Sequence, residues 1–223
     1  MGIAERKKRE RENRRQVILD SARDIILERG VEAVSMSDIA RGCELSKATL
    51  YLYYSNKESL LEALFTEAVT SFVEYAESRI SDSDSGIEAI STLWRCYLDR
   101  FRNSNDIFVL VGVKNFIAPS FPLLYEPADK TSRRAGSRML SLVQEVIERG
   151  LHDGTLETSL DAKTLSRTVF IIASGIVDSV ARLPRDLRDM SIVLAEMQRV
   201  FELLLRGMAA PGVDRSQLSL SEN

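Results

Sequence analysis

The chain has 223 residues, 44% of them hydrophobic, so it can build one large domain or two small ones around a buried core. Its 5 prolines and 11 glycines are too few for a loop-rich or β-sandwich protein. We expect neither a transmembrane helix nor a signal peptide, because the sequence has no run of about 18 apolar residues and no apolar stretch behind its charged N-terminus.

Positive charge gathers at the N-terminal end. The formal net charge is −3, yet residues 1–60 hold 12 Lys+Arg against 10 Asp+Glu, and residues 1–15 hold seven against three. A basic end on an acidic chain is compatible with binding a polyanion, although the excess is too small to decide it. Two distant cysteines, Cys43 and Cys96, predict no disulfide framework and fit a reducing cytoplasm. A redox-sensing pair is the less favoured alternative.

The first elements in chain order are a charged arm and a helix. The tract "ERKKRERENRR" (5–15) predicts a solvated, disordered arm over residues 1–12, which can still touch phosphates. A helix is expected over residues 13–29, since Ile18, Ala22, Ile25 and Ile26 repeat with the period of one buried helical face. Gly30 suits the left-handed position that ends a helix.

Two short helices with a brief joint are predicted next. Ser35 and Asp38 resemble a capping box, which starts a helix at about residue 36 that ends near residue 42 or 43. Ser46 can cap a second helix over residues 47–54. Because only residues 43–45 separate them, the two must cross at a steep angle, as in a helix-turn-helix. The inward contacts are expected from Ile39, Ala40, Leu45 and Leu50.

The rest of the chain also reads as helix. Amphipathic or apolar patterns predict helices from residue 57 to about 80, and then over 87–102, 107–117, 128–151, 161–183 and 187–208. The residues from Pro211 onward are expected to form a frayed tail. No period-2 strand pattern is convincing, so the predicted class is all-α, with about nine helices.

The penultimate helix is apolar nearly all round, so both of its sides must be covered. We expect a second subunit to cover one side, together with a stripe of the last helix; a fully buried helix in a monomer is the alternative. The predicted dimer interface consists of Ala173, Ile176, Val177, Val180, Met197, Val200, Phe201 and Leu204.

The stretch "SMSDIA" followed by "LSKATLYLYYSNKESLL" closely resembles the DNA-binding domain of TetR-family transcriptional regulators, over about residues 14–65. The resemblance implies a three-helix helix-turn-helix domain (13–58), a larger helical effector-binding and dimerisation domain (59–210) and a tail (211–223). It also implies a homodimer that binds a palindromic operator in double-stranded DNA and responds to a small-molecule effector.

The second helix of such a motif places its start at base edges in the major groove. Lys47, Ala48 and Thr49 lie at that start; Lys47 can donate to guanine, and Thr49 can bond a phosphate or present its methyl to thymine. Further DNA contacts are expected from the hydroxyls of Tyr51 and Tyr53, from Leu52, from Ser37, and from Lys57, which begins the next helix. Leu50 and Tyr54 are expected in the core.

Two positions depart from the family's pattern. Glu44 stands where the family usually has glycine, so either it adopts a left-handed conformation at a cost or the turn is shifted. Leu52 stands where the family often carries a polar or aromatic residue, and it could contact a thymine methyl group or a sugar.

The effector pocket implied by the resemblance has weak support in the sequence. Its candidate residues are Trp94, Tyr97, Phe101, Phe108, Phe116 and Asp178. An aromatic stripe at helical spacing more often marks a core than a pocket. Asp178 is expected to pair with Arg182, to bond across the dimer, or to meet a ligand, in that order.

The leading hypothesis is a repressor that is released from DNA by an effector, located in the cytoplasm at the nucleoid. The alternative is a DNA-bound structural or cell-cycle factor with the same head and no small-molecule signal. No nucleophile–base set, phosphate loop or metal-ligand spacing appears, so we expect no enzyme activity, metal or cofactor.

Overall fold

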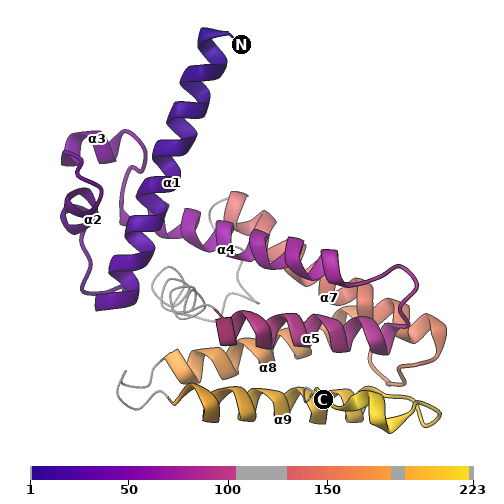
Figure 1. Ribbon diagram of the computed structural model, residues 1–223. Coiled ribbons are helices and arrows are strands. Elements are labelled where there is room, and N and C mark those ends of the chain that lie inside the picture. The colour runs from indigo at the N-terminus through magenta and orange to yellow at the C-terminus, as the bar shows by residue number, and fades with distance from the viewer. Residues whose placement is uncertain (1, 104–129, 182–188, 221–223) are drawn as a thin grey trace.

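The computed structural model describes residues 2–103, 130–181 and 189–220, and its elements are helical, as predicted (Figure 1). They are α1 (Ile3–Arg29), α2 (Met36–Gly42), α3 (Lys47–Tyr51), α4 (Lys57–Arg79), α5 (Gly86–Asn103), α7 (Lys130–Asp153), α8 (Ala162–Ala181), α9 (Met190–Met208) and a short 3₁₀ helix, η2 (Arg215–Leu218). The described ranges contain no strand beyond an isolated bridge between Leu156 and Ala209. The helix predicted over 107–117 lies outside them.

Helix α1 begins ten residues earlier than expected, so the prediction of a disordered arm is wrong. The Glu5 carboxylate accepts a hydrogen bond from the Gly2 N–H at 2.9 Å, which closes the first turn, and Arg6 pairs with Glu10 at 3.5 Å one turn on. Lys, Arg and Glu are good helix formers, and pairs at this spacing add a few tenths of a kcal/mol each. The tract therefore extends the amphipathic helix behind it, and it projects beyond the other helices in Figure 1.

The head, defined here as α1–α3 with the start of α4, follows the predicted caps. Ser35 caps α2 in a capping box with Asp38, and the Ser35 hydrogen bonds lower the pKa of the Asp38 carboxyl. The hydroxyl of Ser46 accepts from the Thr49 N–H at 3.0 Å and caps α3. Gly30 ends α1 with φ 81° and ψ 154°, a region that is nearly restricted to glycine. Helix α3 is shorter than predicted.

Two clusters of buried side chains share one helix. The first joins the head, from Ile18 to Leu64, and the second joins the C-terminal helices. Helix α4 contributes to both: Leu60, Leu61 and Leu64 belong to the first cluster, whereas Phe72, Val73 and Ala76 belong to the second. The predicted domain boundary between residues 58 and 59 therefore falls at the start of a helix that both clusters use.

In the C-terminal part, α7 packs against α4, α5 and α8, and α9 covers α5. The start of α5 meets α7 backbone to backbone: a Cβ atom on Gly86 would stand 2.0 Å from the Gly150 Cα atom. The Asp153 carboxylate accepts from the Gly86 N–H at 2.7 Å. Burial alone would raise the pKa of Asp153, but the hydrogen bonds that it accepts outweigh burial and lower it. Gly86 therefore needs to be glycine for this contact, whereas a Cβ atom on Gly150 would meet the Leu156 side chain at 2.5 Å.

The C-terminal tail is docked rather than frayed, so that prediction is wrong for the described residues. Leu218 and Leu220 are buried in the C-terminal cluster. The Glu202 carboxylate of α9 accepts from the Leu220 N–H at 2.8 Å. Two leucines two residues apart supply enough apolar surface to hold a short segment, and the carboxylate satisfies its backbone.

Candidate nucleic-acid interface

Helix α3 presents one face to solvent and buries the other. Lys47 and Ala48 are exposed at its start, and beyond them Tyr51 is 49% and Leu52 is 75% exposed. Leu50 and Tyr54 are buried in the head, which confirms the prediction for these two residues. The exposed positions thus lie on the surface that a helix-turn-helix presents to a groove.

Two of the predicted DNA contacts, Thr49 and Ser37, lie in the first turns of α3 and α2. Thr49 is half-buried, and its hydroxyl lies 2.8 Å from that of Ser46, within hydrogen-bond distance. Ser37, also half-buried, stands in the first turn of α2. Both hydroxyls sit beside backbone N–H groups at helix N-termini, where phosphate oxygens bind readily.

The turn between α2 and α3 keeps its position and places Glu44 in a left-handed conformation. Its φ is 56°, the one positive value of a non-glycine residue within the described part of the chain. The side chain is exposed, and the N–H of Leu45 still donates to the Ala40 carbonyl at 2.8 Å to close the turn. Of the two expectations for this departure, the left-handed conformation is observed and a shifted turn is not.

Lys57 binds a backbone carbonyl group within the head. It begins α4, and its ammonium donates to the Val31 carbonyl at 2.6 Å, so it fastens the loop between α1 and α2. Burial lowers its pKa, and the nearby Glu58 and Glu32 carboxylates oppose that shift.

Two arginines of α1 contact the tyrosines that follow α3. The Arg11 guanidinium carbon stands 6.0 Å from the centre of the Tyr53 ring, and that of Arg15 stands 4.9 Å from the centre of the Tyr54 ring. Burial raises the pKa of the Tyr54 hydroxyl, and the charge of Arg15 opposes this effect. The sequence gives no local signal for these contacts, because they join positions about 40 residues apart.

The predicted pocket aromatics that the structure describes pack against one another. Trp94 stacks on Phe201 at 4.8 Å between ring centres, and Tyr97 meets Phe72, Phe101 and Phe201 at 5.5 to 5.7 Å. Trp94 and Phe101 are buried in the C-terminal cluster, with Tyr97 partly buried against it. Phe108 and Phe116 lie outside the described residues, as does the side chain of Asp178.

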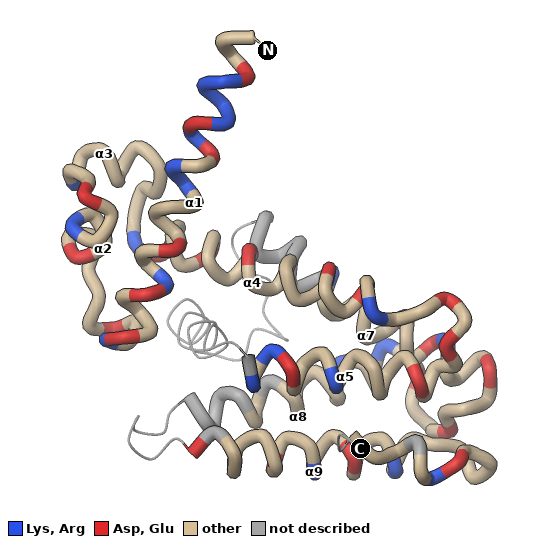
Figure 2. The backbone as a smooth tube through the Cα atoms, viewed as in Figure 1, with Lys and Arg blue, Asp and Glu red and all other residues tan. Residues whose placement is uncertain are grey.

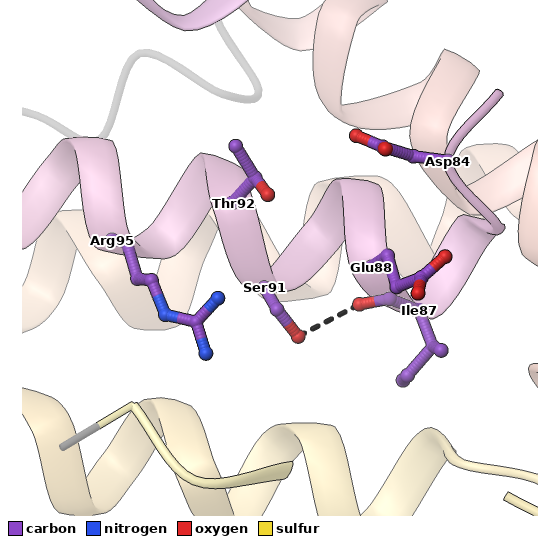
Figure 3. A pocket seen from close by; sticks show the side chains of 6 residues that line it. All are labelled: Asp84, Ile87, Glu88, Ser91, Thr92 and Arg95. Atoms are coloured by element: carbon purple, nitrogen blue, oxygen red, sulfur yellow. Dashed lines mark hydrogen bonds between the residues drawn. The ribbon is translucent and has the colours of Figure 1, made fainter. Parts of the chain in front are cut away.

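A surface hollow lies on another side of α5. It is lined by Asp84, Ile87, Glu88, Ser91, Thr92 and Arg95 (Figure 3). The Ser91 hydroxyl donates to the Ile87 carbonyl at 2.7 Å, and Arg95 donates to the Ser219 carbonyl at 3.1 Å. None of the predicted pocket residues lines this hollow, and its polar rim does not suit an apolar ligand.

The predicted dimer residues divide between the core and the outer side of the helices. Met197 and Phe201 are fully buried within one protomer, so they support the surface of α9 rather than form it. Ala173, Ile176, Val200 and Leu204 are half-buried, and the side chains of Val177 and Val180 lie outside the described set. Sequence reasoning missed two large apolar side chains of α9, Ile192 and Leu203, which are 60% and 69% exposed.

Both cysteines of the chain are free thiols and buried. Burial raises the pKa of the Cys96 thiol, which makes the reactive thiolate less available. Within the described ranges, no helix is long and apolar enough to span a bilayer.

Residues 18–64 match the family described as bacterial regulatory proteins, tetR family. The fatty acid metabolism regulator protein of Bacillus subtilis is 22% identical over 153 residues, which cover 69% of this chain and 76% of that protein. Among solved structures, FadR of Bacillus halodurans is 22% identical, with a TM-score of 0.66 over 86% of this chain and 94% of its own. A TetR-family regulator of Pectobacterium atrosepticum is 21% identical, with a TM-score of 0.69 over 90% and 96%.

At 21–22% identity the solved structures establish the shared fold alone. The family match over residues 18–64 identifies the head as a DNA-binding domain. A helix-turn-helix head followed by a helical C-terminal part is predicted by the sequence, is observed in the described residues, and is the architecture of the solved TetR-family structures. The head of this chain, over residues 18–64, is therefore a DNA-binding domain of the tetR family of bacterial regulatory proteins.

Proposed function

We propose that this protein is a homodimeric repressor that binds a palindromic operator and is released from it by a small-molecule effector. The observation that carries the proposal is the division of α3, where Leu50 is buried while Lys47, Tyr51 and Leu52 stand exposed. Two such heads related by a two-fold axis would read half-sites about 10 base pairs apart in successive major grooves.

Each of the predicted contact residues, exposed or half-buried, has a separate role in this proposal. Lys47, with Ala48 beside it, meets base edges, and Leu52 reaches a thymine methyl group or a sugar. Thr49 and Ser37 lie where a phosphate can approach a helix N-terminus. The hydroxyls of Tyr51 and Tyr53 and the ammonium of Lys57 bind phosphate oxygens, and these contacts set the register of the protein on the duplex.

The dimer is proposed to form through α8 and α9. Ile192 and Leu203 give α9 an apolar outer surface that water covers in one protomer. A second copy related by a two-fold axis would bury this surface together with Val200, Leu204 and the small residues of α8.

The effector is proposed to bind beside the half-buried ring of Tyr97, at the edge of the aromatic cluster. The first ligand to test is a long-chain acyl-CoA, since FadR of Bacillus subtilis, whose structure contains stearoyl-CoA, has the same fold at 21% identity and a TM-score of 0.63, over 86% of this chain and 98% of that one. A thermal shift with stearoyl-CoA, together with loss of operator binding, is expected; free CoA is the control.

Selection of bound duplexes from a random DNA pool, repeated on DNA that flanks the gene, tests the proposal. The expected result is one palindromic sequence, bound roughly a thousandfold or more tighter than random duplex. Equal affinity for every duplex would refute a specific regulator. Binding at many chromosomal sites that no small molecule releases would favour a structural or cell-cycle factor instead.

A further inference from the structure

The N-terminal part of α1 is a rigid, basic projection rather than a tail. Its residues 3–15 hold seven Lys+Arg and three Glu, and positions 2–14 are exposed (Figure 2). At 1.5 Å per residue this segment is about 20 Å long. Nothing in the head's core requires it, because the buried residues of α1 begin at Ile18.

The basic residues continue the buried stripe of α1. Ile18, Ala22 and Ile26 repeat every four residues and face the head. On a helix with 3.6 residues per turn, five basic residues lie within about 80° of the direction of Ile18, and they are called here the basic stripe: Lys7, Lys8, Arg11, Arg14 and Arg15. No glutamate belongs to it, since Glu5, Glu10 and Glu12 fall on the flanks and the opposite face of a helix with 3.6 residues per turn.

Two contacts fix the direction in which the stripe points. Arg11 and Arg15 lie over the rings of Tyr53 and Tyr54, which directly follow α3. The basic stripe therefore lies on the side of α1 that faces the end of α3, next in sequence to the exposed Tyr51 and Leu52, and it continues from there toward the N-terminus. The other two basic residues, Arg6 and Arg9, lie on the opposite face, where Arg6 pairs with Glu10.

We propose that the basic stripe is a second DNA contact, which binds the phosphates that flank each half-site while α3 occupies the major groove. This inference rests on the proposed function, because it needs a duplex seated on α3. The stripe carries only positive charge, it adjoins the base-reading surface, and its helix is held at a set angle. Phosphate contacts of this kind add affinity and salt dependence without sequence preference.

Two double variants of the whole chain distinguish the effect of the basic stripe on DNA binding from the effect of a change in net charge. Lys7→Ala with Arg14→Ala removes two charges from the stripe, and Arg6→Ala with Arg9→Ala removes two from the opposite face. Alanine keeps the helix in both. Affinity for the selected operator is measured over a salt series by fluorescence anisotropy, on a long duplex and on one trimmed to the palindrome.

The stripe pair is expected to bind the long duplex roughly tenfold or more weakly at 0.1 M salt, with a salt slope flatter by up to about 3.6, since a dimer loses four phosphate contacts of about 0.9 each. The control pair should bind like wild type, and trimming should weaken wild type but not the stripe pair. Equal losses in both pairs, or a loss in neither, would overturn the second contact while leaving the operator function intact. Wild type without an operator preference would overturn both. Unchanged DNA binding by the stripe pair, with loss of binding to anionic phospholipid vesicles, would assign the stripe to a membrane and overturn the inference.

Discussion

Replacing Glu44 tests whether the turn between α2 and α3 stores strain. At φ 56° a residue with a Cβ atom loses about 1–2 kcal/mol relative to glycine. Glycine loses about 0.4–1 kcal/mol more conformational entropy on folding. Glu44→Gly should therefore raise the free energy of unfolding of the head by about 0.8 kcal/mol, the difference between the midpoints of these two ranges. Glu44→Ala keeps the strain and removes the carboxylate, so it should stay within about 0.5 kcal/mol of wild type.

Amide hydrogen exchange of α2 and α3 is the suitable assay, because it reports the head alone. The fluorescence of Trp94, the single tryptophan of the sequence, reports the C-terminal cluster and serves as an internal control. All proteins are compared at one concentration, because the stability of a dimer depends on concentration. If Glu44→Gly protects these amides no better than Glu44→Ala does, the left-handed conformation is not a source of strain and the reasoning is wrong.

Three further predictions concern the head, the α5–α7 contact and the tail. Lys57→Ala should weaken binding to all duplexes alike and flatten the salt slope, and loss of its hydrogen bond to Val31 should lower the thermal stability of the head. Lys47→Ala should relax sequence preference without a change in melting temperature. Competition with mutated operators measures the sequence preference of both variants, and calorimetry measures their melting temperatures. Gly86→Ala should lower the free energy of unfolding, measured in urea, by about 1–3 kcal/mol or more, because its Cβ atom would overlap the backbone of α7. Gly212→Ala is the control and should leave that free energy unchanged, because a Cβ atom there meets nothing within 4 Å. Burial alone would raise the pKa of Glu202, but the hydrogen bonds that it accepts lower it below the ordinary value of 4.5, so its contribution to stability is present above about pH 5 and is lost as the pH falls through the folded-state pKa. The protection factors of the tail amides, which correct for the intrinsic pH dependence of exchange, should fall over that range in wild type and be low at every pH in Glu202→Ala.

Local signals were enough to predict the head. Ser35, Ser46 and Gly30 mark helix ends through chemistry confined to a few neighbouring residues, and the buried Leu50 follows from helical spacing. The contacts of Lys57 with Val31 and of Arg15 with Tyr54 join distant positions, so no local pattern could reveal them. The roles of the exposed residues in DNA binding stay predictions.

The two wrong predictions for the chain ends have a common cause. Charge in residues 5–15 and the proline at position 211 predict disorder, because each is locally unfavourable to a packed structure. Helix α1 nevertheless extends through the charged tract, since its amphipathic part supplies the nucleus that an isolated helix lacks. The tail is held by Leu218 and Leu220 on the C-terminal cluster, which only the folded chain brings within reach.

Because α4 belongs to both hydrophobic clusters, the head is not a detachable module. A fragment that ended at residue 58 would lack Leu60, Leu61 and Leu64, three of its buried side chains. A fragment that kept them would end within a helix whose next turns expose Phe72 and Val73 to water. Folding free energy is thus shared along α4, and substitutions in the C-terminal core should change operator affinity even without an effector. Random mutagenesis scored on DNA binding would then recover positions far from the duplex, concentrated where α4 contacts α5 and α7.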